Sequence, residues 1–143
     1  MIFSLDLKLL SYNQYYRNNK NGKRIKTGAG HAYDEELGLL LEDHANALRL
    51  FGEGINPATN IVRLQITMYS PDFYIKDNSR LSMTCGDIDN PVKVFQDKLF
   101  KVIGTDDYII KSLQVDQYPG AEHRAIIGLE ILPLSSIEYS PIW

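Results

Sequence analysis

Apolar and polar residues alternate along three stretches of the chain, which is the pattern of a half-buried β-strand. The stretches are residues 3–9, 62–68 and 80–85. Two further apolar stretches, residues 109–115 and 126–131, are also predicted as strands, and we expect them to pair across the turn-rich sequence between them. The third alternating strand would deliver the chain directly to Asp87.

Two stretches have the helical spacing of apolar residues instead. The first starts with Asp34, Glu35 and Glu36, and its apolar stripe consists of Tyr33, Leu37, Leu40, Leu41, His44, Leu48 and Phe51. The second is predicted to begin with Asn90 as the N-cap and Pro91 as the first helical residue, and its stripe is Val92, Phe95, Leu99 and Val102. Between the first strand and the first helix, residues 11–30 are predicted to form a long polar loop or a loose hairpin.

This order of elements predicts an α+β fold in a single domain that covers residues 1–143. We expect a mixed or antiparallel sheet of about five strands, with two main helices packed on one face. At 143 residues with 44% hydrophobic content, the chain is long enough to bury one core.

Carboxylates follow the third predicted strand and the second predicted helix. Asp87 and Asp89 are two residues apart, so on an extended segment they point to the same side. At about 4 Å and an effective dielectric of about 20, they would repel each other by about 4 kcal/mol. Mg²⁺ or Mn²⁺ offsets such repulsion, since both bind carboxylate oxygens, water and substrate phosphate. With Asp106 and Asp107, which come after the helix, these residues predict a metal site for phosphodiester chemistry; turn and capping roles are the alternative.

Lys93 falls in the first turn of the second helix, where the helix dipole disfavours a cation by about 0.3–1 kcal/mol. This placement suggests that its ammonium group interacts with the neighbouring acids. Lys93 also shares a helix face with Asp97 and Lys101 at four-residue spacing, so an exposed row of ion pairs is the alternative.

The net charge of −3 argues weakly against a nucleic-acid partner, but the distribution of charge points the other way. Residues 17–26 contain five cations and no acid. Salt screens charges over about 8–10 Å, so this patch can act independently of acids elsewhere. The candidate DNA-contacting residues are Arg17, Lys20, Lys23, Arg24 and Lys26, with Tyr15 and Tyr16 as rings that either stack on bases or pack the base of the loop.

Cysteine and apolar segments give further expectations. Cys85 is the single cysteine, so no intrachain disulfide can form, and His31, His44 and His123 do not have zinc-ligand spacing with it. No apolar run has the length of a membrane span or of the hydrophobic part of a signal peptide. We therefore expect the chain to work in the reducing cytoplasm.

Two blocks of sequence resemble a known family. The segment GDIDNPVKVFQDKLFKVIGTDDYII (residues 86–110) resembles the D-x-D-N-x-x-K…D-x-L…D-D block of the RusA-type Holliday-junction resolvases, endodeoxyribonucleases common in prophages. The segment SYNQYYRNNKNGKRIKT followed by HAY (residues 11–33) is similar to the N-N-x-Y-Y-R…basic…A-Y opening of that family. The two blocks occur in the order of the family.

The resemblance implies a homodimeric nuclease of DNA recombination and repair that uses Mg²⁺, or Mn²⁺ as a substitute. Its expected substrate is branched DNA, a four-way junction that it cuts with paired, symmetric nicks. Asp87 and Asp89 match the first two metal carboxylates of the family, and Lys93 matches its catalytic lysine.

The third metal carboxylate is either Asp106 or Asp107. The family aligns the second acid of the pair with the metal, which favours Asp107. Since this chain is one residue shorter between the helix and the pair, Asp106 remains open. Gly86 stands where some members carry a basic residue, which removes one expected phosphate contact.

Two other functions remain compatible with these residues. One is another structure-selective or nonspecific metal-dependent nuclease that acts on flaps, forks or single strands. The other is a noncatalytic DNA-binding phage protein whose carboxylates hold a structural cation.

Overall fold

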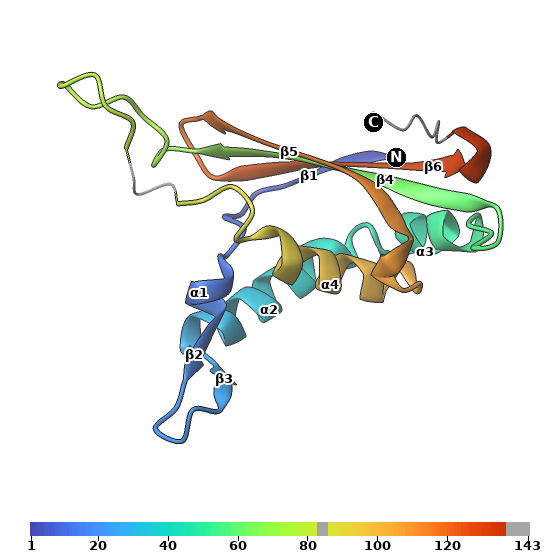
Figure 1. The fold of residues 1–143 in the computed structure, drawn as a ribbon, viewed down its shortest axis with the longest axis horizontal. Coiled ribbons are helices and arrows are strands. Elements are labelled where there is room, and N and C mark those ends of the chain that lie inside the picture. The colour runs from blue at the N-terminus through green and yellow to red at the C-terminus, as the bar shows by residue number, and fades with distance from the viewer. Residues whose placement is uncertain (83–85, 137–143) are drawn as a thin grey trace, which may run out of the picture.

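A computed structural model describes residues 1–82 and 86–136 of the chain. Its main feature is a four-stranded mixed sheet with the helices gathered on one face (Figure 1). This arrangement confirms the predicted α+β class. No helix in the described part of the chain is long and apolar enough to cross a membrane.

The main sheet consists of β1 (Ile2–Leu5), β4 (Asn60–Ser70), β5 (Ile110–Pro119) and β6 (Arg124–Pro133). Their order across the sheet is β1-β6-β4-β5. β6 is antiparallel to both of its neighbours, whereas β4 and β5 are parallel. A second, two-stranded sheet is formed by β2 (Tyr16–Asn18) and β3 (Arg24–Lys26).

The expected pairing of β5 with β6 is wrong, because β4 lies between them. The chain leaves β4, passes through α4 (Val92–Ile103) and returns as β5 beside β4 in the same direction. A helical crossover of this kind produces a parallel pair. The turn after β5 then carries the chain across to the opposite edge of β4.

The first strand ends earlier than the alternation predicts. Leu5 pairs with Ala125, which lies at the start of β6, so β1 has no backbone partner beyond this point. Leu7 and Leu9 are nevertheless buried. The alternation therefore predicted the burial of these two leucines correctly and the length of the strand incorrectly.

The first predicted helix is divided into α2 (Gly28–Glu42) and α3 (Ala45–Glu53). The chain leaves helical geometry at His44, whose φ and ψ are −111° and 4°. Its ring packs against Phe3, with 4.6 Å between the ring centroids. Leu41 and Leu48, one on each side of the bend, are both buried, so the bend lets both helices contribute to the core.

The second predicted helix is present as α4, but it begins one residue later than predicted. Pro91 is the N-cap and Asn90 is not, because the turn that leads into the helix places the Val92 N–H on the carbonyl oxygen of Asp89 at 3.1 Å. Gly104 ends the helix in the left-handed region with φ of 87°, a conformation that glycine adopts without strain.

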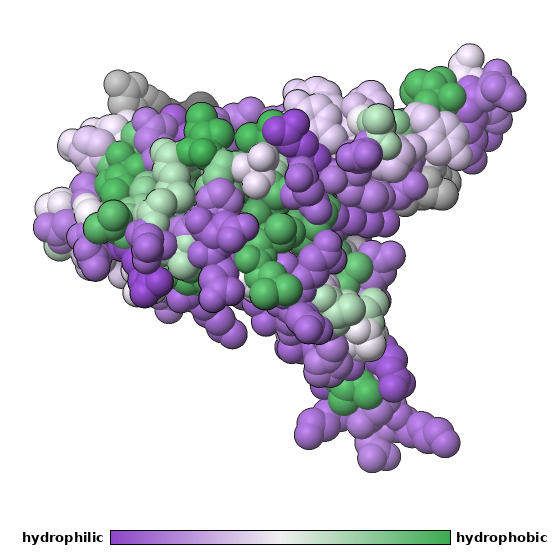
Figure 2. Space-filling model, turned by 180° about the vertical axis from the view of Figure 1, so that it is seen from behind, coloured by the Kyte–Doolittle hydropathy of each residue, from purple (hydrophilic) through white to green (hydrophobic). Residues whose placement is uncertain are grey.

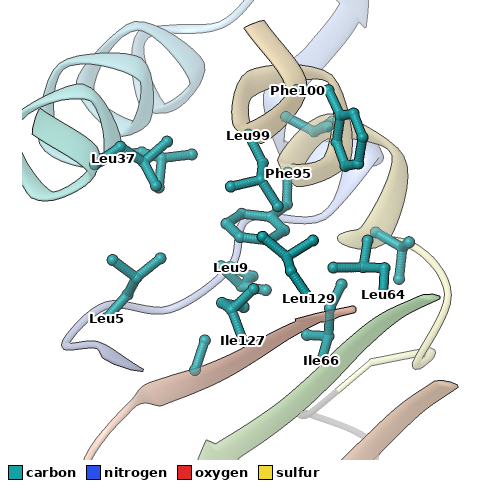
Figure 3. Packing of buried hydrophobic residues seen from close by; sticks show 14 of the residues in the cluster. Leu5, Leu9, Leu37, Leu64, Ile66, Phe95, Leu99, Phe100, Ile127 and Leu129 are labelled. Carbon is teal, nitrogen blue, oxygen red and sulfur yellow. The ribbon is translucent and has the colours of Figure 1, made fainter. Parts of the chain in front are cut away.

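The core lies between the helices and the inner face of the sheet (Figure 3). β4 and β6 supply alternate residues such as Leu64, Ile66 and Ile127, and α4 supplies Phe95 and Leu99. Each of these side chains is at most 2% exposed. At about 1.5–3 kcal/mol for each large apolar side chain, this burial holds α4 firmly against the sheet.

Two segments project from the body on the same side (Figure 1). One is the β2–β3 hairpin, with the short helix α1 (Tyr12–Tyr15) at its base; the hairpin was expected and the helix was not. The other is residues 71–82, where Ile75 and Leu81 form an isolated antiparallel bridge. Figure 2 shows a mainly hydrophilic hairpin and a hollowed outline between the two projections.

The strand predicted at residues 80–85 is not part of either sheet over its described residues. Leu81 belongs to the projecting segment, and Ser82 donates its N–H to the carbonyl oxygen of Tyr74 at 2.9 Å. Met83, Thr84 and Cys85 lie outside the described residues. The 3-10 helices η1 (Asp107–Ile109) and η2 (Leu134–Ser136) precede β5 and follow β6.

Candidate active site

Asp107 is held by two donors from one face of α4. Its carboxylate accepts hydrogen bonds from the Lys93 ammonium group at 3.0 Å and from the Gln96 amide at 2.8 Å. Lys93 and Gln96 are three residues apart, which places them together on a helix surface. The fold thus brings together the predicted catalytic lysine and the favoured third carboxylate.

These contacts fix the charges of both groups. The Gln96 amide and the Lys93 ammonium group lower the pKa of Asp107 to about 2. The carboxylates of Asp107 and then Asp97 raise the pKa of Lys93, and Asp97 lies 3.0 Å from its ammonium group. At neutral pH, Asp107 is therefore an anion and Lys93 a cation.

Asp106 has a different task from its neighbour. Its side chain accepts the N–H of Tyr108 at 3.1 Å and caps η1. The two successive carboxylates therefore have different partners, a backbone N–H for Asp106 and α4 for Asp107.

Asp87 and Asp89 lie on the exposed loop between the projecting segment and α4. Gly86, immediately before them, has φ of 69° and no neighbouring atom near the position of a Cβ. Glycine is therefore suited to this position for its backbone conformation, where some family members carry a basic residue.

The loop is tied to the opening segment of the chain. The backbone carbonyl of Asn90 accepts the N–H of Tyr12 at 3.0 Å. Tyr12 begins α1, whose N-cap Ser11 forms a reciprocal capping box with Gln14. The two sequence blocks that were identified separately thus meet in space beside the acidic loop.

All four candidate metal-binding aspartates belong to the described residues, yet no three acidic, histidine or cysteine side chains among those residues are close enough together to hold a metal ion. The chemistry of the donors suits Mg²⁺, which prefers carboxylate oxygens. The geometry leaves Asp107 bound to Lys93 and Gln96. The predicted metal site of Asp87, Asp89 and Asp107 stays a prediction.

Asp87 lines a hollow together with basic side chains that the sequence did not indicate as part of the site. Lys8, His123 and Arg124 line it as well. Lys8 and His123 approach Asp72 at 3.5 and 3.8 Å. Lys8, Asp87 and the His123–Arg124 pair lie far apart in the sequence, so no local pattern indicates that they line one hollow.

The basic hairpin presents most of its cations to solvent. Arg17, Lys20, Lys23 and Arg24 are exposed. Asn19 organises the tip, since its side-chain oxygen accepts the N–H groups of Asn21 and Lys23 at 3.0 and 2.9 Å. The positive charges are thus displayed on an ordered turn that extends from the body (Figure 1).

Asp34 is the acceptor of a second, partly buried network. The Tyr15 hydroxyl donates to both of its carboxylate oxygens at 2.7 and 2.8 Å, and the Lys98 ammonium group lies at 3.1 Å. Lys26 also forms an ion pair with Asp34. The network connects β3, α1, α2 and α4 through one carboxylate.

This network changes the interpretation of two predicted DNA-contacting residues. Tyr15 is 2% exposed, so its ring packs the base of the hairpin and is not accessible for base stacking. The ammonium group of Lys26 is engaged by Asp34. Lys98, which sequence reasoning missed, joins the network because it faces α1 and α2 across the helix packing.

Comparison with known proteins gives one family. The sequence matches the family described as Endodeoxyribonuclease RusA over residues 10–130. The chain belongs to the RusA family. None of the curated proteins matches it.

The matched range of the RusA family includes α1, the basic hairpin, the acidic loop and the Asp106–Asp107 pair. As a member of this family, the chain is an endodeoxyribonuclease, a hydrolase of phosphodiester bonds in DNA. RusA-family enzymes act on branched DNA, in keeping with the resemblance of the two sequence blocks.

Proposed function

We propose that this RusA-family chain is a Mg²⁺-dependent endodeoxyribonuclease that resolves four-way DNA junctions by paired nicks. The observation that carries the proposal is the Asp107 carboxylate held by Lys93 and Gln96 on the helix that follows the Asp87–Asp89 loop. An anion and a cation maintained side by side suit the handling of a cation and a phosphate at the same site.

Asp87, Asp89 and Asp107 would hold the divalent cation. Bound there, the cation would neutralise charge on the scissile phosphate and lower the pKa of the attacking water. The oxygen donors come from the loop before α4, with Asp87 and Asp89, and from the turn after it, with Asp107. The buried stripe of α4 fixes the helix, which holds Asp107 in place through Lys93 and Gln96.

Lys93 acts as a fixed positive charge in this proposal. Because its neighbours raise the pKa of its ammonium group, it is poorly suited to accept a proton from water at neutral pH. Its charge instead stabilises the negative charge that develops on the phosphate as the P–O bond breaks. Loss of this charge therefore affects turnover more than substrate binding.

The DNA strand would run from the acidic loop toward the basic hairpin. The contact between Tyr12 and Asn90 joins these two regions, and Arg17, Lys20, Lys23 and Arg24 extend the positive surface outward. A homodimer would supply two such sites to the two strands that are cut in a junction. We expect light scattering of the purified protein to give twice the mass of one chain.

The test is cleavage of a synthetic four-way junction that carries a different 5′ label on each strand. We expect paired nicks in symmetric strands in Mg²⁺ and none with EDTA, and little cleavage of a linear duplex of the same sequence. Equal cutting of flaps, forks and single strands would instead favour a broader structure-selective or nonspecific nuclease. Binding without cleavage in either Mg²⁺ or Mn²⁺ would favour a noncatalytic DNA-binding protein.

A further inference from the structure

A hollow lies between α4 and the base of the basic hairpin, next to the candidate active site. Its walls include four cations, Arg24, Lys93, Lys98 and Lys101, and the rings of Tyr12 and Tyr16. Arg24 comes from β3 and the three lysines come from α4, which are distant in sequence. Only the tertiary fold creates this group of positive charges.

The four cations differ in whether they are already neutralised. Lys93 is paired with Asp97 and Asp107, and Lys98 with Asp34. Asp97 also lines the hollow, where Lys93 compensates its charge. Arg24 and Lys101 form no ion pair with any carboxylate among the described residues, so the hollow keeps two uncompensated positive charges on opposite elements.

Arg24 is held in one orientation by aromatic rings. Its guanidinium group lies 4.4 Å from the centroid of the Tyr16 ring and 5.4 Å from that of Tyr12, and it donates a hydrogen bond to the Tyr12 hydroxyl. A guanidinium group stacked on a ring keeps hydrogen-bond donors at its edge for a phosphate.

The same contacts argue against a base in this hollow. Arg24 covers one face of the Tyr16 ring. The ring of Tyr15 stands edge-on to the Tyr16 ring, with 4.6 Å between the two ring centroids. A ring with these neighbours has little free face for stacking. The chemistry that remains is that of a small anion held by two cations.

We infer that Arg24 and Lys101 together bind one backbone phosphate of the DNA strand, separate from the phosphate that is cut at Asp107 and Lys93. This inference rests on the proposed function, because it names a second contact on the same substrate. Joined in this way, the hairpin and α4 would fix the position of the strand relative to the cleaved bond. Lys101 would then be a DNA-binding residue and not only part of an exposed row of charges on α4.

The test is binding of a fluorescent four-way junction in EDTA over a salt series, with Arg24→Gln, Lys101→Gln and the double variant. Each neutralised phosphate contributes about 0.9 to the slope of log K against log salt. If both cations serve one phosphate, the double variant loses about 0.9 per chain, and its loss of affinity is smaller than the sum of the two single losses. A loss of about 1.8 per chain with additive affinities, or an unchanged slope, would overturn the shared site.

Matched variants separate charge from structure. Arg24→Lys keeps the charge and should keep the slope. Arg49→Gln removes a cation from the exposed surface of α3 and should change nothing. Thermal unfolding shows whether Arg24→Gln loosens the hairpin. In that case Lys101→Glu is tested instead of Arg24→Gln, and it should weaken binding more than Lys101→Gln does.

Cleavage of the same junction by the unaltered protein in Mg²⁺ is measured in parallel. Loss of slope in the double variant without cleavage by the unaltered protein would overturn the nuclease proposal and leave the phosphate site standing. Cleavage with unchanged slopes in the variants would overturn the phosphate site alone.

Discussion

At the scale of single residues, Asp106 and Asp107 show how one position along the chain changes the role of a carboxylate. Asp106 faces its own backbone and caps η1, while Asp107 faces α4 and receives Lys93 and Gln96. The sequence left both residues open as the third metal carboxylate. The contacts in the fold favour Asp107 for chemistry and Asp106 for local structure.

We therefore expect Asp107→Asn to abolish junction cleavage while DNA binding in EDTA remains. Asp106→Asn should retain most of the cleavage, since an asparagine oxygen can still cap η1. Asp106→Ala should retain cleavage as well but lose about 1 kcal/mol of unfolding free energy. Single-turnover cleavage and chemical denaturation measure the two effects, and an inactive Asp106→Asn beside an active Asp107→Asn would reverse the assignment.

Lys93→Ala should lower the rate of the chemical step strongly and weaken junction binding only modestly, since its charge is used chiefly as the phosphate bond breaks. Lys111→Ala is the control, because Lys111 is an exposed cation on β5 outside the acidic loop. The measurement is single-turnover cleavage at saturating enzyme. An unaltered rate together with weaker binding would make Lys93 a binding residue only.

At the scale of elements, Asp34 joins four elements through one carboxylate. Burial alone raises its pKa, but the hydrogen bonds from Lys26, Tyr15 and Lys98 outweigh burial and lower the pKa below its ordinary value of 3.8. A carboxyl group with a lowered pKa in the folded state stabilises the protein above its unfolded pKa. That stabilisation is lost as the pH falls below about 4.

Asp34→Asn should lower the free energy of unfolding by about 1–3 kcal/mol at pH 7, since two ammonium groups and a buried hydroxyl lose their charged acceptor. The unaltered protein should also lose more stability than the variant as the pH falls from 5 to 2, because only the unaltered protein has the carboxyl group whose pKa is lowered by folding. Urea denaturation across this pH range measures both effects. Glu35→Gln, an exposed neighbour, is the control, and equal acid sensitivity of all three proteins would contradict the network's role.

The contact between α3 and α4 depends on Gly52. A Cβ at this position would collide with the backbone carbonyl oxygen of Ile103, and backbone cannot move aside as a side-chain end can. Gly52→Ala should therefore cost about 1–3 kcal/mol of unfolding free energy. Gly38→Ala, inside α2 with open space around it, should instead stabilise the protein by up to about 1 kcal/mol. Denaturant unfolding of the two variants decides this, and equal stabilities would contradict it.

At the scale of the whole molecule, the body carries two projections, and the acidic loop follows the second of them and leads into α4 (Figure 1). The core between the sheet and the helices fixes α4, and α4 fixes Lys93. The tip of the basic hairpin extends outside this core, so the charges of Lys20 and Lys23 can change without a change in packing. Substrate binding and folding stability are therefore separable in this fold.

Lys20→Gln with Lys23→Gln at the hairpin tip should reduce the salt slope of junction binding by up to about 1.8 per chain and leave the melting temperature unchanged. The cleavage rate at saturating enzyme should change little, since both residues are exposed and distant from Asp107 in the chain. Binding to the junction and to a linear duplex over a salt series is the measurement. An unchanged slope would show that the tip is only solvated.

The sequence by itself determined which segments are buried, the class of the fold and the candidate residues for chemistry. Hydrophobic spacing predicted β4, α4 and the core leucines, because burial follows from local alternation and helical period. Spacing along the chain also predicted the proximity of Lys93 to Asp97. These properties depend on residues that are close together in the sequence.

Only the tertiary structure decided the order of the strands, the bend at His44 and the length of β1. Each depends on a partner that is far away in the sequence, such as β4 between β5 and β6 or the start of β6 opposite Leu5. The same reason explains why the sequence missed Lys98 and left Tyr15 open between stacking on bases and packing the base of the loop. Both residues contact the carboxylate of Asp34, which only packing brings to α1 and α4.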